Sequence, residues 1–562
     1  MSKILSKLKN TENDKIIPKE ELAKPKNLIN IKPIIKKTIQ WEKSRKNKNI
    51  KKNINSAYFY IQLFIFIIMI NQSMSDLGII ITAIHPQNDE SYKIFNCTEF
   101  TKPDKLIING DESADINISD EDKFIYIQPE STDREEDNIV LIWKYSDKEK
   151  EIKKYLNKTS IFNRFFDFIN SISDGEPSIE EGAELNGMGL FHDCSNIKSI
   201  NFNYFHTTFI TNMYQMFDSC TSLISVTGLS LEKVKNMAYL FNDCYSLKNV
   251  YFATSGISRP TNMEYMFNNC KNLLSLDLSK INTVDITNME SMFYNCENLN
   301  NLNLGLNFYL AKAENMRNMF ANCKSLTYLT LYTGNSAKSS LLYMNSMFYN
   351  CINLQTLNFN FYTRNIANME FMFYGCRKLI SLDLSTFNTN YLTSIEAMFY
   401  GCSQLSTLNL ETFNTFHIHN MSSLFYGCES LASLNLNTFQ TINVEYMDYM
   451  FYNCRSLKLL YWHTDNFKTN NVIKMNSMFE LCSSFASMNL NFFVTSKVND
   501  MNSMFSGCSS LISLYINNFD TSLVYNMSKM FNGCWNLKTF DITNLKTTEV
   551  KDMSLMFNDC YF

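Results

Sequence analysis

The stretch NMEFMFYGCRKLISLDLSTFNT, residues 368–389, carries the pattern that decides the fold. The same pattern recurs in fifteen copies that align on a cysteine, and nine of the 14 intervals between these cysteines are 26 residues, the others running from 24 to 28. The aligned cysteines are Cys194, Cys220, Cys244, Cys270, Cys296, Cys323, Cys351, Cys376, Cys402, Cys428, Cys454, Cys482, Cys508, Cys534 and Cys560. A repeat this regular, in a chain of 562 residues, predicts a solenoid.

Two periodicities divide each copy. Four apolar residues have the spacing of one helix face, namely Met369, Met372, Phe373 and Cys376. Asn368 precedes them and has the side chain of a helix N-cap. Leu382 and Leu384 then alternate with polar neighbours, which is the period of a strand. We therefore predict an α/β leucine-rich-repeat solenoid of about 15 coils, each with a short helix or turn followed by a parallel strand.

The predicted helices and strands need different spacings. Parallel strands stack at roughly 4.8 Å, whereas packed helices need about 8–10 Å between their axes. A coil that contains both is therefore wider on its helical side. This mismatch predicts a curved rod with the strands on the concave side.

The cysteine has a structural explanation. A residue that occurs once per coil at a fixed position is predicted to point into the core beside its counterparts, and free cysteine packs as a small apolar residue. Adjacent ladder cysteines have parallel Cβ vectors, which disfavours disulfides. There is no CxxC pair and the six His are scattered, so neither a zinc site nor any other cofactor is predicted. The core ladder is expected to include Phe373, Cys376, Phe399, Cys402, Phe451 and Cys454.

The repeat N-M-x-x-M-F-x-x-C-x-x-L-x-x-L-x-L-x-x-F-x-T resembles that of the BspA-like leucine-rich repeat surface proteins, the DUF285 type, found in bacteria and protists. The resemblance covers residues 184–562. It implies a leucine-rich-repeat solenoid displayed at a cell surface, in a family linked to adhesion and to binding of host or matrix proteins. It brings no catalytic residue.

The N-terminal flank predicts a membrane-directed segment. Residues 1–56 carry 16 Lys and Arg against five Asp and Glu, and we expect a basic, disordered tail. Residues 57–70, AYFYIQLFIFIIMI, are uncharged and too short for the roughly 20 residues of a spanning helix. We predict a signal or anchor segment at 57–75, with the N-terminus inside and the rest of the chain outside. The alternative is a buried core strand behind a basic tail. The tail lacks a nucleic-acid-binding motif, so no nucleic-acid partner is expected.

Between this segment and the repeats we expect two further regions. Residues 76–150 contain four strand-like stretches, GIIITAI, KLIING, KFIYIQ and NIVLIWKY, and hold eleven acidic residues between positions 111 and 137. We predict a small acidic β-rich domain there and a helical linker at 151–183. The solenoid then occupies residues 184–562.

Outward-pointing residues of the strands are the candidate ligand-binding positions. The residues on either side of the second leucine point away from the core, and they are mostly Ser or Thr before it and Asn or Asp after it. The simplest interpretation is a solvated sheet surface. The functional interpretation is a platform for a protein or glycan, with Tyr anchors where the pattern is broken. The candidates are Tyr328, Asp383, Asn409, Asn435, Tyr461, His463 and Tyr515, while Trp462 falls on an inward column.

No catalytic order of residues or phosphate-binding loop is visible, so we predict a non-catalytic protein. The function favoured is a cell-surface or secreted adhesion protein that binds an extracellular protein or glycan, with a membrane contact through residues 57–70 if they are not cleaved. The alternative is an intracellular repeat scaffold, because free thiols suit a reducing compartment. The last copy stops before its strand, which predicts an open C-terminal sheet edge. We expect either self-association through this edge or a natural chain that continues beyond residue 562.

Overall fold

The computed structural model describes residues 76–84, 92–96, 105–108, 117–118, 124–127, 136–144 and 185–561, the last range with gaps at 203–206, 208–209, 254–255, 333–339, 361–362 and 364. The chain divides into two units, Met1–Met74 and Ser75–Phe562, and all these residues belong to the second unit. The predictions for the basic tail at 1–56, the segment at 57–75 and the linker at 151–183 therefore lie outside the described residues.

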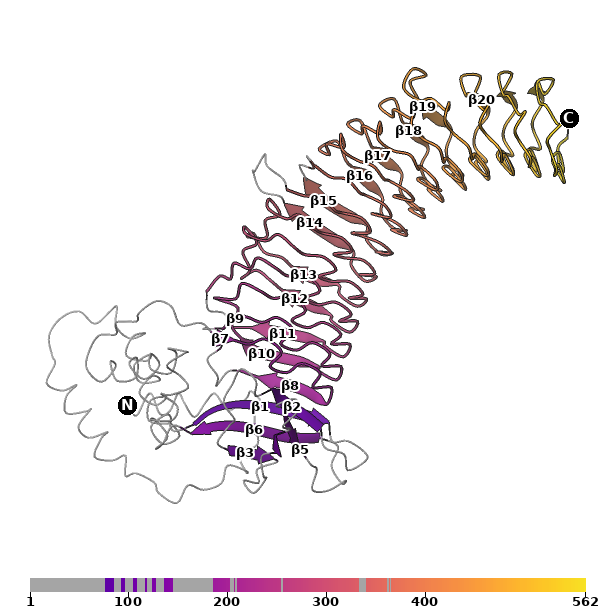
Figure 1. The fold of residues 1–562 in the computed structure, drawn as a ribbon. Coiled ribbons are helices and arrows are strands. Elements are labelled where there is room, and N and C mark those ends of the chain that lie inside the picture. Colours follow the sequence, from indigo (N-terminus) through magenta and orange to yellow (C-terminus); the bar gives the residue numbers. More distant parts are fainter. Residues whose placement is uncertain are drawn as a thin grey trace, which may run out of the picture. The chain divides into compact units, whose positions relative to one another are not determined.

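The repeats form a solenoid with one parallel strand per coil, as Figure 1 shows. Leu382 of one coil lies opposite Leu408 of the next, so equivalent residues form rows along the stack. The strands are β8 (Ile197–Asn201), β10 (Ser225–Leu229), β11 (Asn249–Phe252), β12 (Ser275–Asp277), β13 (Asn301–Asn303), β14 (Tyr328–Tyr332), β15 (Thr356–Asn360), β16 (Ser381–Asp383), β17 (Thr407–Asn409), β18 (Ser433–Asn435), β19 (Leu459–Tyr461), β20 (Ser487–Asn489), β21 (Ser513–Tyr515) and β22 (Thr539–Phe540). Two shorter strands, β7 (Leu185–Asn186) and β9 (Ile210–Asn212), pair with each other in the first coils. The predicted leucine-rich-repeat solenoid is confirmed.

Strands from the N-terminal flank continue the solenoid sheet. They are β1 (Asp76–Ile84), β2 (Tyr92–Asn96), β3 (Lys105–Ile108), β4 (Asn117–Ile118), β5 (Phe124–Ile127) and β6 (Glu136–Lys144). The four stretches expected to be strands overlap β1, β3, β5 and β6. Strand β1 pairs antiparallel with both β6 and the first long solenoid strand, β8, in a sheet of order β11-β10-β8-β1-β6-β3. The N-terminal edge of the solenoid sheet is therefore covered by the flank.

Of the short helix or turn predicted before each strand, the structure has the turn, and the described residues contain no α-helix. In all fifteen copies the residue directly before the cysteine and the residue five before it have φ between 49° and 73°, as Gly375 and Phe371 do. Left-handed residues cannot continue a right-handed helix. Each segment is a run of tight turns instead, and Asn368 begins it by accepting a hydrogen bond from the Glu370 amide at 2.8 Å.

Backbone hydrogen bonds explain why turns replace the helix. Amides within a turn segment alternate between two kinds of acceptor. Met372 donates to the carbonyl of Met369 in its own coil, whereas Phe373 donates to Met398 in the next coil. The strand side and the turn side of the coil are thus both spaced by hydrogen bonds between coils. The wider helix spacing on which the predicted curvature depended does not apply, because the coils contain no helix.

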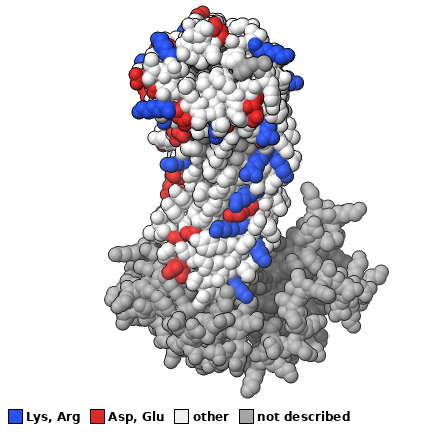
Figure 2. All heavy atoms as spheres, turned by 90° about the vertical axis from the view of Figure 1, so that its right-hand side faces the viewer, with Lys and Arg blue, Asp and Glu red and all other residues white. Residues whose placement is uncertain are grey.

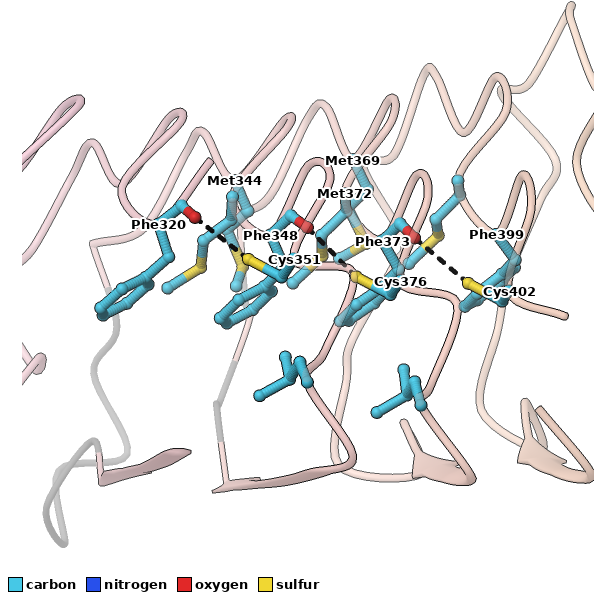
Figure 3. Packing of buried hydrophobic residues seen from close by; sticks show 14 of the residues in the cluster. Phe320, Met344, Phe348, Cys351, Met369, Met372, Phe373, Cys376, Phe399 and Cys402 are labelled. Atoms are coloured by element: carbon cyan, nitrogen blue, oxygen red, sulfur yellow. Dashed lines mark hydrogen bonds between the residues drawn. The ribbon is translucent and has the colours of Figure 1, made fainter. Parts of the chain in front are cut away.

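The core consists of unbroken columns, shown for four coils in Figure 3. Fifteen phenylalanine rings, from Phe191 to Phe557, stack with centroids 5.0–5.9 Å apart and interplanar angles of 2–16°. The methionine columns beside them are buried except at the last coil. The six expected core residues are at most 1% exposed: Phe373, Cys376, Phe399, Cys402, Phe451 and Cys454.

The repeat cysteines are free thiols, and from Cys220 to Cys560 each one hydrogen-bonds to the preceding coil. The Sγ of Cys376 donates to the carbonyl oxygen of Phe348 at 3.1 Å, and Cys402 does the same to Phe373 (Figure 3). Burial raises the pKa of the thiols of Cys351 and Cys402 to about 12. These thiols are therefore protonated and unreactive at neutral pH, because the thiolate is the nucleophile.

A buried threonine column completes the coil after each strand. Thr469 is 1% exposed; its hydroxyl donates to the carbonyl of Val494 at 2.9 Å and accepts from the amide of the same residue at 2.7 Å. Thr495 bonds to Asp520 in the same way. In the coils where both bonds form, as at Thr469 and Thr495, the hydroxyl satisfies two backbone groups of the following coil, which explains the preference for threonine at this position of the repeat.

Candidate binding surfaces

The outer face of the sheet is almost without charge. We call the two outward positions on either side of the central apolar residue, in strands β8 and β10 to β22, the strand face. These positions hold Ser, Thr, Asn, Tyr and one Leu, and no Lys, Arg or Glu. The exceptions are three aspartates: Asp277, Asp383 and Asp541. The strand face is thus a flat, polar, nearly uncharged surface along the solenoid.

The expected Asn and Asp candidates stabilise turns. The Oδ1 of Asp383 accepts a hydrogen bond from the amide of Ser385 at 3.0 Å. Asn409 and Asn435 accept in the same way from the amides two residues further on, both at 3.1 Å. Asx turns of this kind explain why Asn and Asp follow the strand in most copies. One side-chain oxygen of each of these three candidates therefore already accepts a hydrogen bond that stabilises a turn.

The tyrosine candidates are exposed. Tyr461 and Tyr515 are 49% and 41% exposed, in the row after the central leucine. Tyr328 lies in the row before the leucine, and its hydroxyl accepts from the Thr330 hydroxyl at 2.5 Å and from the Asn358 amide at 3.4 Å. These two hydrogen bonds lower the pKa of Tyr328.

His463 lies just beyond β19. Its Nδ1 accepts from the amide of Asp465 at 3.3 Å, so it occupies the turn position that Asn or Asp takes in other coils. Trp462, between Tyr461 and His463, packs against Phe492 at 5.3 Å and Phe467 at 5.2 Å, as expected for an inward column. The insertion in this coil is therefore filled by aromatic packing.

The structure brings most candidates into one row. Asp383, Asn409, Asn435 and Tyr461 occupy the same position in four consecutive coils, followed by Asn489 and Tyr515 in the next two. Tyr328 belongs to the other row of the strand face, two coils before Asp383. The row from Asp383 to Tyr515 is the longest run of sequence-predicted candidates.

A second aromatic row was missed by the sequence reasoning. Five half-buried tyrosines directly follow the core phenylalanine and stack with centroids 4.2–4.7 Å apart. They are Tyr349, Tyr374, Tyr400, Tyr426 and Tyr452. Burial and the neighbouring tyrosines raise the pKa of Tyr426. The Phe-Tyr pair in five consecutive copies was the available signal. Because the ring faces cover each other, this row offers hydroxyl groups rather than open stacking surfaces.

Carboxylates form a half-buried column beside the turns. Glu396 accepts from the Nδ2 of Asn420 at 2.8 Å, and Glu370 and Asp448 occupy the same position in nearby coils. Burial, followed by the charges of Glu370 and Asp448, raises the pKa of Glu396. Among the residues that the structure describes, no group of three His, Cys, Asp or Glu side chains could hold a metal ion.

Charged residues lie away from the middle of the face seen in Figure 2, which is largely uncharged, with Lys and Arg gathered along one flank. In the part of the chain that the structure covers, no helix has the length and apolarity needed to cross a membrane.

Comparison with known proteins identifies the repeat. The family model described as Mycoplasma protein of unknown function, DUF285, matches residues 152–254, 183–301, 211–332, 332–433, 379–492 and 473–562. Among solved structures, a leucine-rich repeat protein from Bacteroides ovatus is 18% identical, with a TM-score of 0.38, over 65% of this chain and 84% of that chain. A leucine rich cell surface protein from Faecalibacterium prausnitzii is 15% identical, with a TM-score of 0.32, over 62% and 83%. No curated protein matches the sequence.

Proposed function

We propose, since the chain belongs to the DUF285 family of repeat proteins, that it is a non-catalytic binding protein displayed at or secreted from the cell surface. Its ligand is an extracellular protein or glycan, held on the strand face. The observation that carries this proposal is the continuous row of exposed, short polar side chains with tyrosines at Tyr461 and Tyr515. A rod of stacked coils offers an extended surface, which suits binding of a large ligand.

The surface location is supported by the order of segments along the chain. The basic tail is followed by the apolar run at 57–70, and the charge bias of this arrangement directs the following residues outward. A chain that keeps this segment is anchored in the membrane, and a chain that loses it is secreted.

The second candidate is an intracellular scaffold. It is favoured by the fifteen free repeat cysteines, since thiols persist in reducing compartments. Their burial and raised pKa values also protect them in an oxidising one, so the surface proposal accommodates them.

Protease accessibility on intact cells tests the proposal. Cells producing the full chain with a tag after Phe562 are treated with a non-permeant protease, and tag loss is compared with that after detergent lysis. Loss of the cell-associated tag on intact cells, or tagged protein in the medium, supports surface display or secretion. A tag that is protected until lysis and absent from the medium would exclude both and favour the scaffold.

A further inference from the structure

The absence of charge on the strand face restricts the kind of ligand that it fits. The outward positions of the four strands β18 to β21 are Ser433, Asn435, Leu459, Tyr461, Ser487, Asn489, Ser513 and Tyr515. None of them is charged, and Lys458 directly precedes β19 in the sequence. A charged partner would lose hydration on this surface without gaining a counter-charge. An uncharged ligand rich in hydroxyl groups has no charged group to dehydrate, so it does not incur this cost.

The two tyrosines are spaced by two coils. Tyr461 and Tyr515 occupy the same position of the repeat, with Asn489 in the coil between them. Strands β19 and β20 belong to separate sheets, so the row is interrupted between Tyr461 and Asn489 at the level of strand pairing. An extended polysaccharide that runs along the solenoid can stack one sugar ring on each tyrosine and contact Asn489 with the segment between them.

Asn489 has a free donor at this intermediate position. Its Oδ1 accepts from the amide of Asn491 at 3.1 Å, which fixes the side chain, while its Nδ2 has no partner among the described residues. An amide held in place in this way can donate to a sugar hydroxyl with little loss of side-chain entropy. The turn-stabilising role of the Asn column thus leaves a row of oriented donors on the strand face.

The shape of the surface favours a linear polymer over a protein. Leu459 and Tyr461 are neighbours on the outer side of β19, whereas Tyr515 lies two coils away with Ser and Asn at the outward positions between them. Protein interfaces depend on clustered, buried anchors surrounded by a polar rim. A row with two separated aromatic positions that follows the rod matches a linear ligand.

We propose that the strand face over β18 to β21 binds a neutral, linear polysaccharide that runs along the solenoid, with sugar rings stacked on Tyr461 and Tyr515 and the segment between them on Asn489. This inference rests on the proposed binding function and specifies its ligand class.

Affinity electrophoresis of the full chain tests the ligand class. The probes are four neutral polysaccharides (a β-glucan, a xylan, a mannan and an α-glucan), with heparin and single-stranded DNA as anionic polymers. We expect retardation by at least one neutral probe that persists when the salt concentration is raised about tenfold, because binding without ion pairs is insensitive to screening. Tyr461→Ala and Tyr515→Ala should each weaken this binding by about tenfold, as loss of an aromatic anchor does.

Matched controls separate the strand face from general effects. Tyr391→Ala removes a tyrosine that is 63% exposed and lies outside the strand face, and it should leave binding unchanged. All three variants should unfold at the same temperature as the wild-type protein, since the tyrosines are exposed. No retardation by any neutral probe, or retardation that Tyr391→Ala reduces as much as Tyr461→Ala, would overturn the inference. Binding only to heparin or DNA would also overturn it while leaving a surface binding function intact, whereas the protease experiment tests that function separately.

Discussion

Replacing Gly401 by alanine distinguishes the turn segment from a helix by the sign of its effect. Gly401 lies directly before Cys402 and has a φ of 69°. An added Cβ would meet only the Cα and amide nitrogen of Gly375, at 3.7 Å and 3.9 Å, which is ordinary contact. The consequence of the substitution is therefore conformational rather than steric. A left-handed alanine costs about 1–2 kcal/mol relative to glycine, so Gly401→Ala should destabilise the coil by that amount.

A helix at the same residues would give the opposite result. Within a helix, alanine is more stable than glycine by about 1 kcal/mol. The two structures therefore differ by roughly 2–3 kcal/mol in the effect of one methyl group. Asparagine tolerates left-handed φ, and it occupies the position before the cysteine in five other copies, as at Asn453. Gly401→Asn is the matched control and should cost less than Gly401→Ala.

The assay must report on the individual coil, because repeat proteins open locally. Hydrogen exchange of peptides covering residues 385–428, followed by mass spectrometry under native conditions, measures the free energy of opening there. We expect faster exchange in Gly401→Ala than in the wild-type protein, with unchanged exchange near residues 197–229. Slower exchange in Gly401→Ala would show that the segment is helical and would refute the turn assignment.

Three further outcomes follow from the core and the electrostatics. Thr469→Val should destabilise its coil by about 2–4 kcal/mol, because two part-buried backbone groups of Val494 lose their hydrogen-bond partner. Thr469→Ser keeps the hydroxyl and should retain most of the stability in the same hydrogen-exchange measurement. The fourteen buried repeat cysteines, such as Cys351, should react with a thiol reagent only after denaturation, whereas Cys560 in the last coil is half-buried. After denaturation fifteen thiols should be counted without reductant in residues 185–562, and cross-links between adjacent coils in mass spectrometry would contradict this. Because the pKa of Glu396 is raised by folding, its ionisation costs stability that the protein loses as pH rises above the ordinary carboxyl pKa. Glu396→Gln should therefore raise the melting temperature at neutral pH and have no effect at a pH well below the ordinary carboxyl pKa. An equal rise in melting temperature at both pH values would show that the effect does not come from the ionisation of Glu396.

The repeat pattern alone was sufficient to predict which equivalent residues form inward and outward rows along the solenoid. The period of about 26 residues places equivalent residues above one another, so a position that is always Phe or Cys must be inward and a variable polar position outward. The alternation around Leu382 likewise fixed the strand and its exposed neighbours, Ser381 and Asp383. These inferences needed no knowledge of the turn geometry, because they depend only on periodicity and burial.

The roles of individual outward residues could not be read in the same way. Asn435 is exposed, as expected, and Asn409 is half-buried, but the side-chain oxygens of both accept hydrogen bonds in turns that only the backbone conformation reveals. The tyrosine row from Tyr349 to Tyr452 was visible as a repeated Phe-Tyr pair, yet its stacking depends on how closely the coils approach.

The sequence by itself determined that the chain repeats, which residues form the core and where each strand lies. The tertiary structure decided between a helix and a run of turns. The spacing of Met369, Met372, Phe373 and Cys376 suits both, and the outcome depends on where the backbone amides find their acceptors. In an isolated copy only the residue's own coil is available. In the stack, Phe373 donates to Met398 of the next coil, and these bonds between coils stabilise the left-handed residues that exclude the helix.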